Sequence, residues 1–326
     1  MFTFEDIIGY EDIKKHLQNS IRLNRLSHAY IIEGLEGSGK KLIAGTIAKT
    51  LQCEEKGDTP CNTCISCTTF DSGNHPDVIY VEQMKKKSIG VEEIRKQVQD
   101  TIDIKPYKYP YKIYIIDRAE KLTEQAQNAL LKTIEEPPGY AMILLLTKNS
   151  NSFLPTILSR CVLLNLRPQS FDIIKDYLIK SEGVPDYQAD IYAQFSNGSI
   201  GLAKKLAISE EFVSMKEEMI SLLTTLKTIN KVERMNQYKE LEKYKDQIQS
   251  ILDFMTIWYR DILFYKELGD TGYIMNKDNI DLIKEQSHGT YESILNNLQL
   301  IEETKYKLRR NTNFQLTMEI LLLNLK

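Results

Sequence analysis

A glycine-rich turn between a strand pattern and a helix pattern most constrains the fold of this chain. Residues 34–41 have the sequence GLEGSGKK, which matches the phosphate-loop pattern G-x-x-x-x-G-K-[ST] as far as Lys40. Residues 28–33 before it are largely apolar, as in a short strand, and residues 40–51 after it have helical spacing. This order lets backbone N–H groups and the start of a helix surround an anion. A purely structural glycine turn is the alternative.

The loop predicts phosphate ligands but lacks one ligand for magnesium. The candidate phosphate ligands are Gly34, Gly37, Gly39 and Lys40. The next position normally supplies a Ser or Thr hydroxyl to Mg²⁺, and here it holds Lys41. The sequence therefore favours descent from a nucleotide-binding fold. Whether ATP or ADP still binds is left open, and magnesium-dependent hydrolysis is not expected.

A second acidic ligand for magnesium is expected at the end of another apolar strand. Asp117 follows the largely apolar strand pattern at residues 112–116 and is the candidate. Arg118 comes next, where ATPases of this architecture often have a glutamate that orients the attacking water, and a guanidinium cannot act as a base. Glu120 is the nearby stand-in. Asp117 as a helix cap is the alternative interpretation.

A cysteine cluster predicts a metal site. Four of the five cysteines have the spacing C-x7-C-x2-C-x2-C, and they are Cys53, Cys61, Cys64 and Cys67. Two-residue spacers let thiolates converge on one tetrahedral ion, and four sulfurs leave no open position for a substrate. We expect structural zinc in a module at residues 53–67. An iron–sulfur cluster and free thiols are the alternatives.

The order of predicted elements indicates an α/β domain followed by helices. Strands are expected at 78–81, 112–117, 141–147 and 161–166, and helices at 91–101 and 123–136. This alternation predicts a parallel sheet with helices on both faces. Strand patterns stop after Pro168, and only helical patterns follow. We expect three domains, at residues 1–167, 168–208 and 209–326.

Charge and hydropathy exclude some classes of protein. Lysine and arginine total 42 against 45 acidic residues, and the net charge of −3 gives no general attraction to nucleic acid or acidic membranes. The basic clusters at 84–87 and 309–310 are expected to be solvated faces. No apolar run approaches the roughly 18 residues of a membrane span, and the first residues lack the basic start of a signal peptide. A cytoplasmic protein is expected.

The motifs together resemble a known family. Between residues 28 and 161 the chain has His28-Ala-Tyr, the altered loop, the four cysteines, IDRAE at 116–120, NALLKTIEEP at 128–137 and Ser159-Arg160-Cys161. In this order they resemble the bacterial clamp-loader subunits of DNA polymerase III. The resemblance implies an AAA+ fold with a small helical lid and an all-helical collar. It also implies a five-membered ring that places the beta sliding clamp on primed DNA.

Departures from the family pattern select one kind of subunit. Motor subunits, gamma or tau, have a hydroxyl after the loop lysine, an acidic pair at the second motif and Gly-Ser-x-Arg in the lid. This chain has Lys41, Arg118 and Gly201 at those places. Ser159-Arg160-Cys161 is intact, and in this family that arginine reaches the ATP site of the next subunit. The chain therefore resembles the delta-prime subunits, with Arg160 as an arginine finger acting in trans.

The resemblance implies partners and a role within a larger complex. Gamma or tau, delta, the beta clamp and, through the complex, primed DNA are the expected partners. The chain is expected to be a component of the DNA polymerase III holoenzyme, a DNA-directed DNA polymerase and transferase complex, and not a catalyst alone. The apolar C-terminal helices are expected to form an inter-subunit collar, with intramolecular packing as the alternative. The rival functions are an ATP-hydrolysing motor subunit and a P-loop phosphotransferase.

Overall fold

A five-stranded parallel sheet is the centre of the N-terminal part of the chain. The computed structural model describes residues 2–82 and 88–325, so the basic cluster at 84–87 lies outside the described residues. The order of the strands across the sheet is β2-β3-β4-β1-β5, and all pairs are parallel. The strands are β1 (Ala29–Gly34), β2 (Val78–Tyr80), β3 (Lys112–Ile116), β4 (Ala141–Thr147) and β5 (Val162–Leu166).

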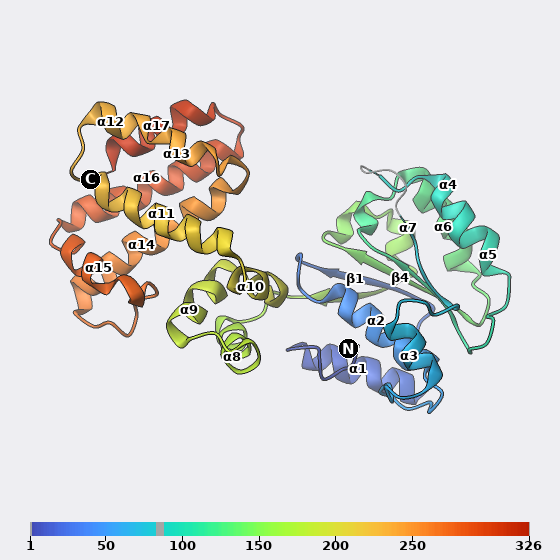
Figure 1. The fold of residues 1–326 in the computed structure, drawn as a ribbon. Helices are drawn as coiled ribbons and strands as arrows, with labels where there is room; N and C mark the ends of the chain where they lie inside the picture. The colour runs from blue at the N-terminus through green and yellow to red at the C-terminus, as the bar shows by residue number, and fades with distance from the viewer. Residues whose placement is uncertain (1, 83–87, 326) are drawn as a thin grey trace. The chain divides into compact units, whose positions relative to one another are not determined.

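Alternating side chains bury both faces of this sheet. Successive residues of a strand point to opposite faces, so Ile32 and Leu144 join one apolar cluster while Ile31 and Ile143 join another. Helices α1, α2 and α3 lie on one side of the sheet and α4, α5, α6 and α7 on the other (Figure 1). The predicted parallel sheet with helices on both faces is therefore confirmed.

The helices of this part lie close to the predicted ranges. They are α1 (Glu11–Arg22), α2 (Lys40–Gln52), α3 (Ile65–Asp71), α4 (Val91–Ile94), α5 (Asp100–Ile102), α6 (Glu124–Glu135) and α7 (Pro155–Leu158). The helix expected at 91–101 is interrupted by a π-helical segment, η1 (Arg95–Gln99). Thr123 begins α6 as its N-cap by accepting a hydrogen bond from the N–H of Ala126, and Pro137-Pro138 follow the end of the helix.

The rest of the chain is helical in the part that the structure describes. Its helices are α8 (Phe171–Glu182), α9 (Asp186–Phe195), α10 (Ile200–Ala207), α11 (Glu210–Thr225), α12 (Lys231–Asn236), α13 (Tyr238–Glu242), α14 (Ile248–Leu268), α15 (Ile280–Gln286), α16 (Tyr291–Arg309) and α17 (Phe314–Asn324). A row of rings joins α9 to α11 and α14, since Phe195 contacts Phe212 and Phe254, and Phe254 contacts Trp258. These contacts bury the only tryptophan completely.

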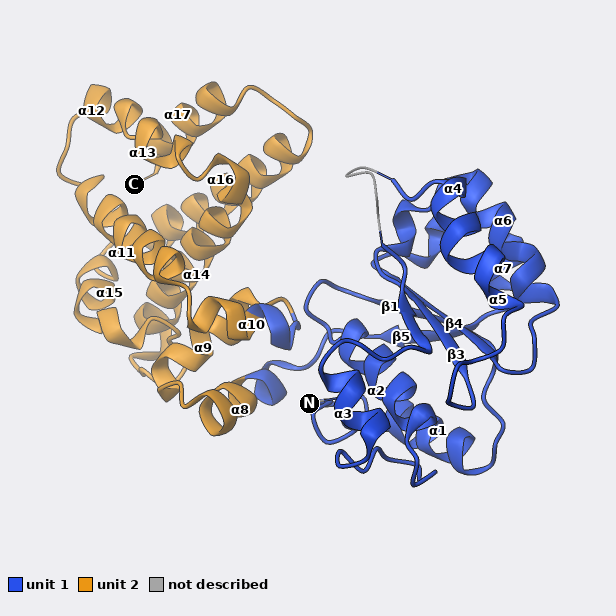
Figure 2. Ribbon diagram, turned by 45° about the vertical axis from the view of Figure 1, so that its right-hand side comes forward, with its two compact units in different colours: residues 1–174, 198–202 blue, residues 175–197, 203–326 orange. Residues whose placement is uncertain are grey.

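The chain divides into two compact units. One contains residues 1–174 and 198–202, and the other contains 175–197 and 203–326 (Figure 2). The second unit has its own charged network, in which the largely buried Asp190 of α9 lies 2.6 Å from Lys175 and 2.9 Å from Lys277. The three-domain division at 167 and 208 stays a prediction. Within the described residues, no helix combines the length and the apolar character that crossing a membrane requires.

Candidate functional site

The glycine loop follows β1 and leads into α2, as the motif predicts. Gly37 and Gly39 have φ values of 75° and 93°, a region that favours glycine and allows the tight curve of the loop. The Lys40 ammonium donates to the carbonyl oxygens of Gly34 and Leu35, at 2.7 and 2.6 Å. Burial lowers the pKa of Lys40. The Lys40 side chain thus stabilises the loop by binding two of its backbone carbonyl groups.

A cavity of about 410 Å³ lies against the loop. It is lined by Glu36, Gly37, Gly39, Lys40, Lys41, Leu42, Asp117, Arg118, Glu120, Leu146 and Lys148. The carboxyl ends of β1, β3 and β4 meet here because neighbouring parallel strands end at the same edge of a sheet. The structure therefore brings most of the predicted nucleotide-site residues together, but Gly34 is not among the lining residues.

An ion pair occupies the region where magnesium ligands are expected. The Lys41 ammonium lies 2.9 Å from Oδ2 of Asp117. Asp117 caps neither following helix, because Arg118 is the N-cap of η2 (Ala119–Lys121) and Thr123 is the N-cap of α6. The position that normally helps to hold a cation thus supplies a cation itself.

Of the remaining charged groups of the cavity, Glu120, Lys148 and Glu36 make hydrogen bonds or ion pairs. Arg118 is exposed and has a left-handed backbone with φ of 52°. Glu120, the stand-in for the missing base, accepts a hydrogen bond from the backbone N–H of Lys148 at 3.3 Å. The Lys148 side chain donates to Glu36 at 2.6 Å. Lys148 was missed by sequence reasoning, although its place directly after β4 at the same sheet edge was a usable signal.

Residues at the start of α10 and just before it donate hydrogen bonds to backbone carbonyls of the glycine loop. The Gly201 N–H donates to the carbonyl of Gly37 at 2.9 Å, and the Ser199 hydroxyl donates to the carbonyl of Glu36 at 2.7 Å. A Cβ atom at position 201 would lie 2.7 Å from the Gly37 carbonyl oxygen. This contact therefore requires glycine at position 201, and the sequence pattern alone did not reveal it.

Arg160 lies at the opposite edge of the sheet. It sits between α7 and β5, just before Val162, which pairs with Tyr30 near the start of β1. Its guanidinium is 3.0 Å from Glu135 and donates to the carbonyl of Thr156 at 3.1 Å. The side chain is 40% exposed. Arg160 is thus separated from the glycine loop of its own chain and accessible from outside.

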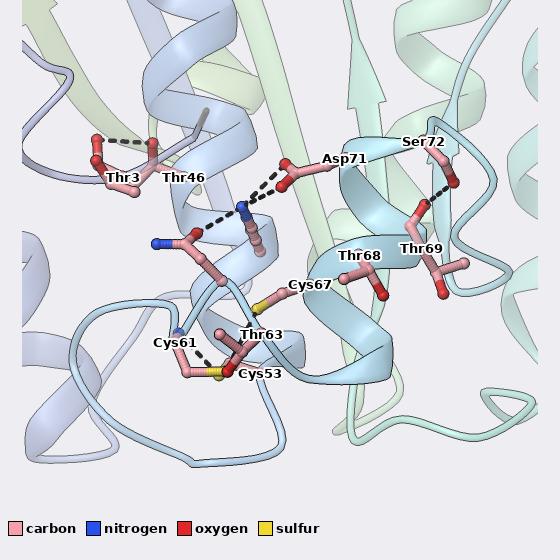
Figure 3. Close-up of polar contacts among 12 residues, drawn as sticks. Thr3, Thr46, Cys53, Cys61, Thr63, Cys67, Thr68, Thr69, Asp71 and Ser72 are labelled. Carbon is pink, nitrogen blue, oxygen red and sulfur yellow. Dashed lines mark hydrogen bonds and ion pairs between the residues drawn. The ribbon is translucent and has the colours of Figure 1, made fainter.

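The four predicted metal ligands converge. The sulfur atoms of Cys53, Cys61, Cys64 and Cys67 all lie within 4.8 Å of one another. Tetrahedral zinc with Zn–S bonds of about 2.3 Å requires sulfurs about 3.8 Å apart, so small shifts would complete the site. The cluster lies where the end of α2 meets the start of α3 (Figure 3). These residues can hold a metal ion.

Backbone N–H groups already stabilise the cysteine sulfurs. The N–H of Cys61 donates to Cys53, that of Cys64 donates to Cys61, and that of Cys67 donates to Cys64, at 3.3 to 3.4 Å. Hydrogen bonding, first of all by the backbone of Thr63, lowers the pKa of Cys61 to about 6. Burial raises the pKa of Cys53 and of Cys67. A bound cation would favour the thiolate forms of these buried groups.

A buried lysine supports the cysteine cluster. Lys49 of α2 is fully buried, and its ammonium contacts both carboxylate oxygens of Asp71 at 2.8 and 2.9 Å. It also donates to Asn62, between Cys61 and Cys64, at 2.7 Å. Asp71 faces α2 from the end of α3 (Figure 3). Sequence reasoning missed Lys49 because a lysine within a helix pattern normally lies on a solvated face.

The fold and the site define a P-loop-like α/β protein, in which the glycine loop joins β1 to α2 and lacks the hydroxyl that normally binds magnesium. Family models described as DNA polymerase III, delta subunit, and as its C-terminal part match residues 9–170 and 215–326. The chain is 32% identical over 320 residues to DNA polymerase III subunit delta′ of Bacillus subtilis, covering 96% of this chain and 95% of that protein. The chain therefore belongs to the delta-prime subunits of the DNA polymerase III clamp loader.

Other DNA polymerase III subunits are also similar to the chain. DNA polymerase III subunit tau of Bacillus subtilis is 29% identical over 302 residues, which span 85% of this chain and 53% of that protein. Among solved structures, a gamma subunit-related protein of DNA polymerase III from Thermotoga maritima covers 94% of this chain and 97% of its own, with 21% identity and a TM-score of 0.39. That score is too low to bear on function.

Replacing Gly201 with alanine is expected to loosen the contact between α10 and the glycine loop. The added Cβ would overlap the Gly37 carbonyl, and such overpacking costs about 1–3 kcal/mol. Hydrogen exchange of peptides covering residues 34–42 should rise in this variant. Intrinsic fluorescence does not follow this region, because the only tryptophan, Trp258, belongs to the other unit.

Gly139→Ala is the matched control, because nothing lies within 4 Å of a Cβ at that position. Its loop peptides should exchange like those of the unchanged protein. Equal exchange in both variants would contradict the assigned role of Gly201.

Replacing Cys64 with serine is expected to abolish stoichiometric metal binding. The unchanged chain should bind about one zinc ion, because four thiolates close a tetrahedral shell. The metal content of the purified proteins and the visible absorption of cobalt-substituted samples measure this. Cys161→Ser is the control, since Cys161 lies outside the cluster and burial raises its pKa to about 11. Retention of full zinc by the Cys64→Ser protein would contradict a four-cysteine site.

Proposed function

We propose that the chain acts as the subunit of a clamp loader that completes the ATP site of its neighbour and does not hydrolyse ATP itself. The separation of Arg160 from the glycine loop, at opposite edges of one parallel sheet, supports this division most directly. The edge at the carboxyl ends of the strands lacks the magnesium hydroxyl and the catalytic base that hydrolysis needs. The edge at the amino ends presents the accessible guanidinium of Arg160.

Arg160 is suited to act on a neighbouring subunit. Hydrolysis of ATP spreads negative charge over the γ-phosphoryl oxygens, and an arginine supplied in trans accelerates it by about 10³ to 10⁵. The ion pair with Glu135 is partly exposed at both ends, and exposed pairs contribute at most about 1 kcal/mol. Glu135 therefore holds the guanidinium in place. Breaking this pair so that the guanidinium can contact a phosphate would cost little energy.

Loss of hydrolysis in the chain itself follows from several substitutions at one edge. Lys41 supplies no hydroxyl and pairs with Asp117, so neither group is available to Mg²⁺. Arg118 cannot serve as a base, and the Glu120 carboxylate accepts a backbone hydrogen bond. These arrangements argue against the rival function of a motor subunit. A phosphotransferase gives no role to the cysteine cluster or to Arg160.

Structural zinc is the proposed occupant of the cysteine cluster. Four sulfur donors at short spacing favour Zn²⁺ or an iron–sulfur cluster. The short connection from Cys61 to Cys67 and its N–H···S bonds are typical of a single-ion site. With four sulfurs bound, the zinc would have no open position, so its contribution would be to hold α2 against α3.

Partners and location follow from family membership. We propose gamma or tau and delta as fellow subunits, the beta clamp and primed DNA as the objects of the assembled loader, and a cytoplasmic site of action. The helices of residues 209–326 would serve as the collar and those of 168–208 as the lid. Copurification with these partners tests the assignment.

Arg160→Ala is expected to slow ATP hydrolysis at the neighbouring site by about 10³ or more, because the γ-phosphoryl charge loses its trans partner. ATPase activity and clamp loading by the reconstituted complex measure the effect, and assembly should be unchanged. Arg167→Ala is the matched control, because Arg167 is an exposed arginine just past the other end of β5. Normal clamp loading with Arg160→Ala would refute the arginine finger.

The purified chain without other subunits is expected to hydrolyse no ATP above background. Without the hydroxyl the loop lacks a ligand for Mg²⁺, and without the base no group activates the attacking water. Steady-state phosphate release, with and without magnesium, measures this. Turnover that depends on Glu120 would favour the motor-subunit alternative.

A further inference from the structure

The cavity beside the glycine loop retains features of a phosphate site. We propose that it binds a di- or triphosphate chain without a metal ion, with the Lys41 ammonium in the role that magnesium has in related loops. This inference rests on the proposed function only in that the loop has lost magnesium-dependent hydrolysis. The ligand class is a phosphoanion, supplied either as a nucleotide or as an inorganic polyphosphate.

The cavity has suitable size and walls. Its volume of about 410 Å³ lies within the range of about 300–1,000 Å³ of small-molecule sites. Gly37, Gly39 and the first residue of α2, Lys40, line one side, so the N-terminus of a 13-residue helix begins at the cavity. Backbone N–H groups at such a position favour negative charge.

The charges of the lining residues favour an anion. The cations are Lys40, Lys41, Arg118 and Lys148, and the acids are Glu36, Asp117 and Glu120. Four cations against three acids leave one positive charge before any ligand binds. A metal ion would add to the repulsion among the cations, whereas a polyphosphate would relieve it.

Lys41 can connect a carboxylate to a phosphate as magnesium does. An ammonium group has three donors, and the contact with Asp117 at 2.9 Å uses one of them. The same contact neutralises the carboxylate that would otherwise repel a phosphate. Because the ammonium holds this carboxylate, Mg²⁺ would have to displace a covalently attached cation to reach Asp117.

The existing pairs in the cavity can exchange for a phosphate at small cost. Lys41 is 68% exposed and Glu36, the acceptor from Lys148, is 81% exposed. Exposed pairs of this kind contribute little to stability. A charge-assisted bond to a phosphate oxygen is stronger. Lys40, with its pKa lowered mainly by burial, would also gain from a nearby anion.

Isothermal titration of the full chain with inorganic tripolyphosphate and with ADP tests this proposal. The titrations are run in magnesium-free buffer without chelator, so that metal on the cysteines is undisturbed, and are repeated with excess Mg²⁺. We expect binding without magnesium and weaker binding with it, since the metal competes for the phosphates. Similar affinities for tripolyphosphate and ADP would show that the site recognises the phosphate chain alone. Tighter binding of ADP would show that the site also contacts the nucleoside.

Lys41→Thr restores the hydroxyl of the motif and identifies the group responsible. Its affinity without magnesium should fall about tenfold, the loss of one charge-assisted bond, and magnesium should now strengthen binding. Lys15→Thr, at an exposed lysine of α1, should bind like the unchanged chain. Melting temperatures confirm that the variants fold.

Two results would overturn the proposal. One is the absence of heat with both ligands at millimolar concentration in magnesium-free buffer. The other is binding to the unchanged chain that requires magnesium. Neither result bears on Arg160, whose role is measured by neighbour-site ATPase activity, so failure here is separable from failure of the proposed function.

Discussion

The common direction of the five strands is the constraint on which the arrangement of this protein depends. Helical crossovers keep the strands parallel, so all carboxyl ends gather at one edge of the sheet and all amino ends at the other. The glycine loop, Asp117 and Lys148 follow carboxyl ends, whereas Arg160 precedes the amino end of β5. Substitutions at one edge therefore leave the geometry of the other intact. A subunit can lose hydrolysis and keep an arginine for its neighbour.

The altered edge is not an empty remnant of an ATPase site. Lys41 pairs with Asp117, and Gly201 permits a backbone contact with Gly37 that any side chain would obstruct. Two of the three departures from the gamma and tau pattern, Lys41 and Gly201, thus have a structural counterpart in a contact of this chain. Because Lys41 and Asp117 are partly exposed, their ion pair organises the cavity but contributes little to stability. The Gly201 contact ties the start of α10 to the glycine loop and so helps the loop to keep its shape.

Local pattern predicted the elements, but not the pairs that lock them together. The strand expected at 141–147 is β4 within the same bounds, because an apolar run between turns has few other solutions. The metal ligands were predictable because their spacing is itself the signal. The contact of Lys49 with Asp71 was not, since a buried lysine has the same periodicity as a solvated one. The approach of Gly201 to Gly37 depends on tertiary packing, which no local pattern encodes.

Helix α2 connects the cysteine cluster to the phosphate cavity. The helix begins at Lys40 and ends at Gln52, next to Cys53, so its 13 residues separate the two sites by about 20 Å. Lys49 fixes its last turns to α3 through Asp71. A helix packed at its far end against the cysteine cluster and a buried ion pair resists tilting, and its first turn then presents the loop in a constant orientation. The contacts at the end of α2 therefore stabilise the helix whose first turn forms one wall of the phosphate cavity.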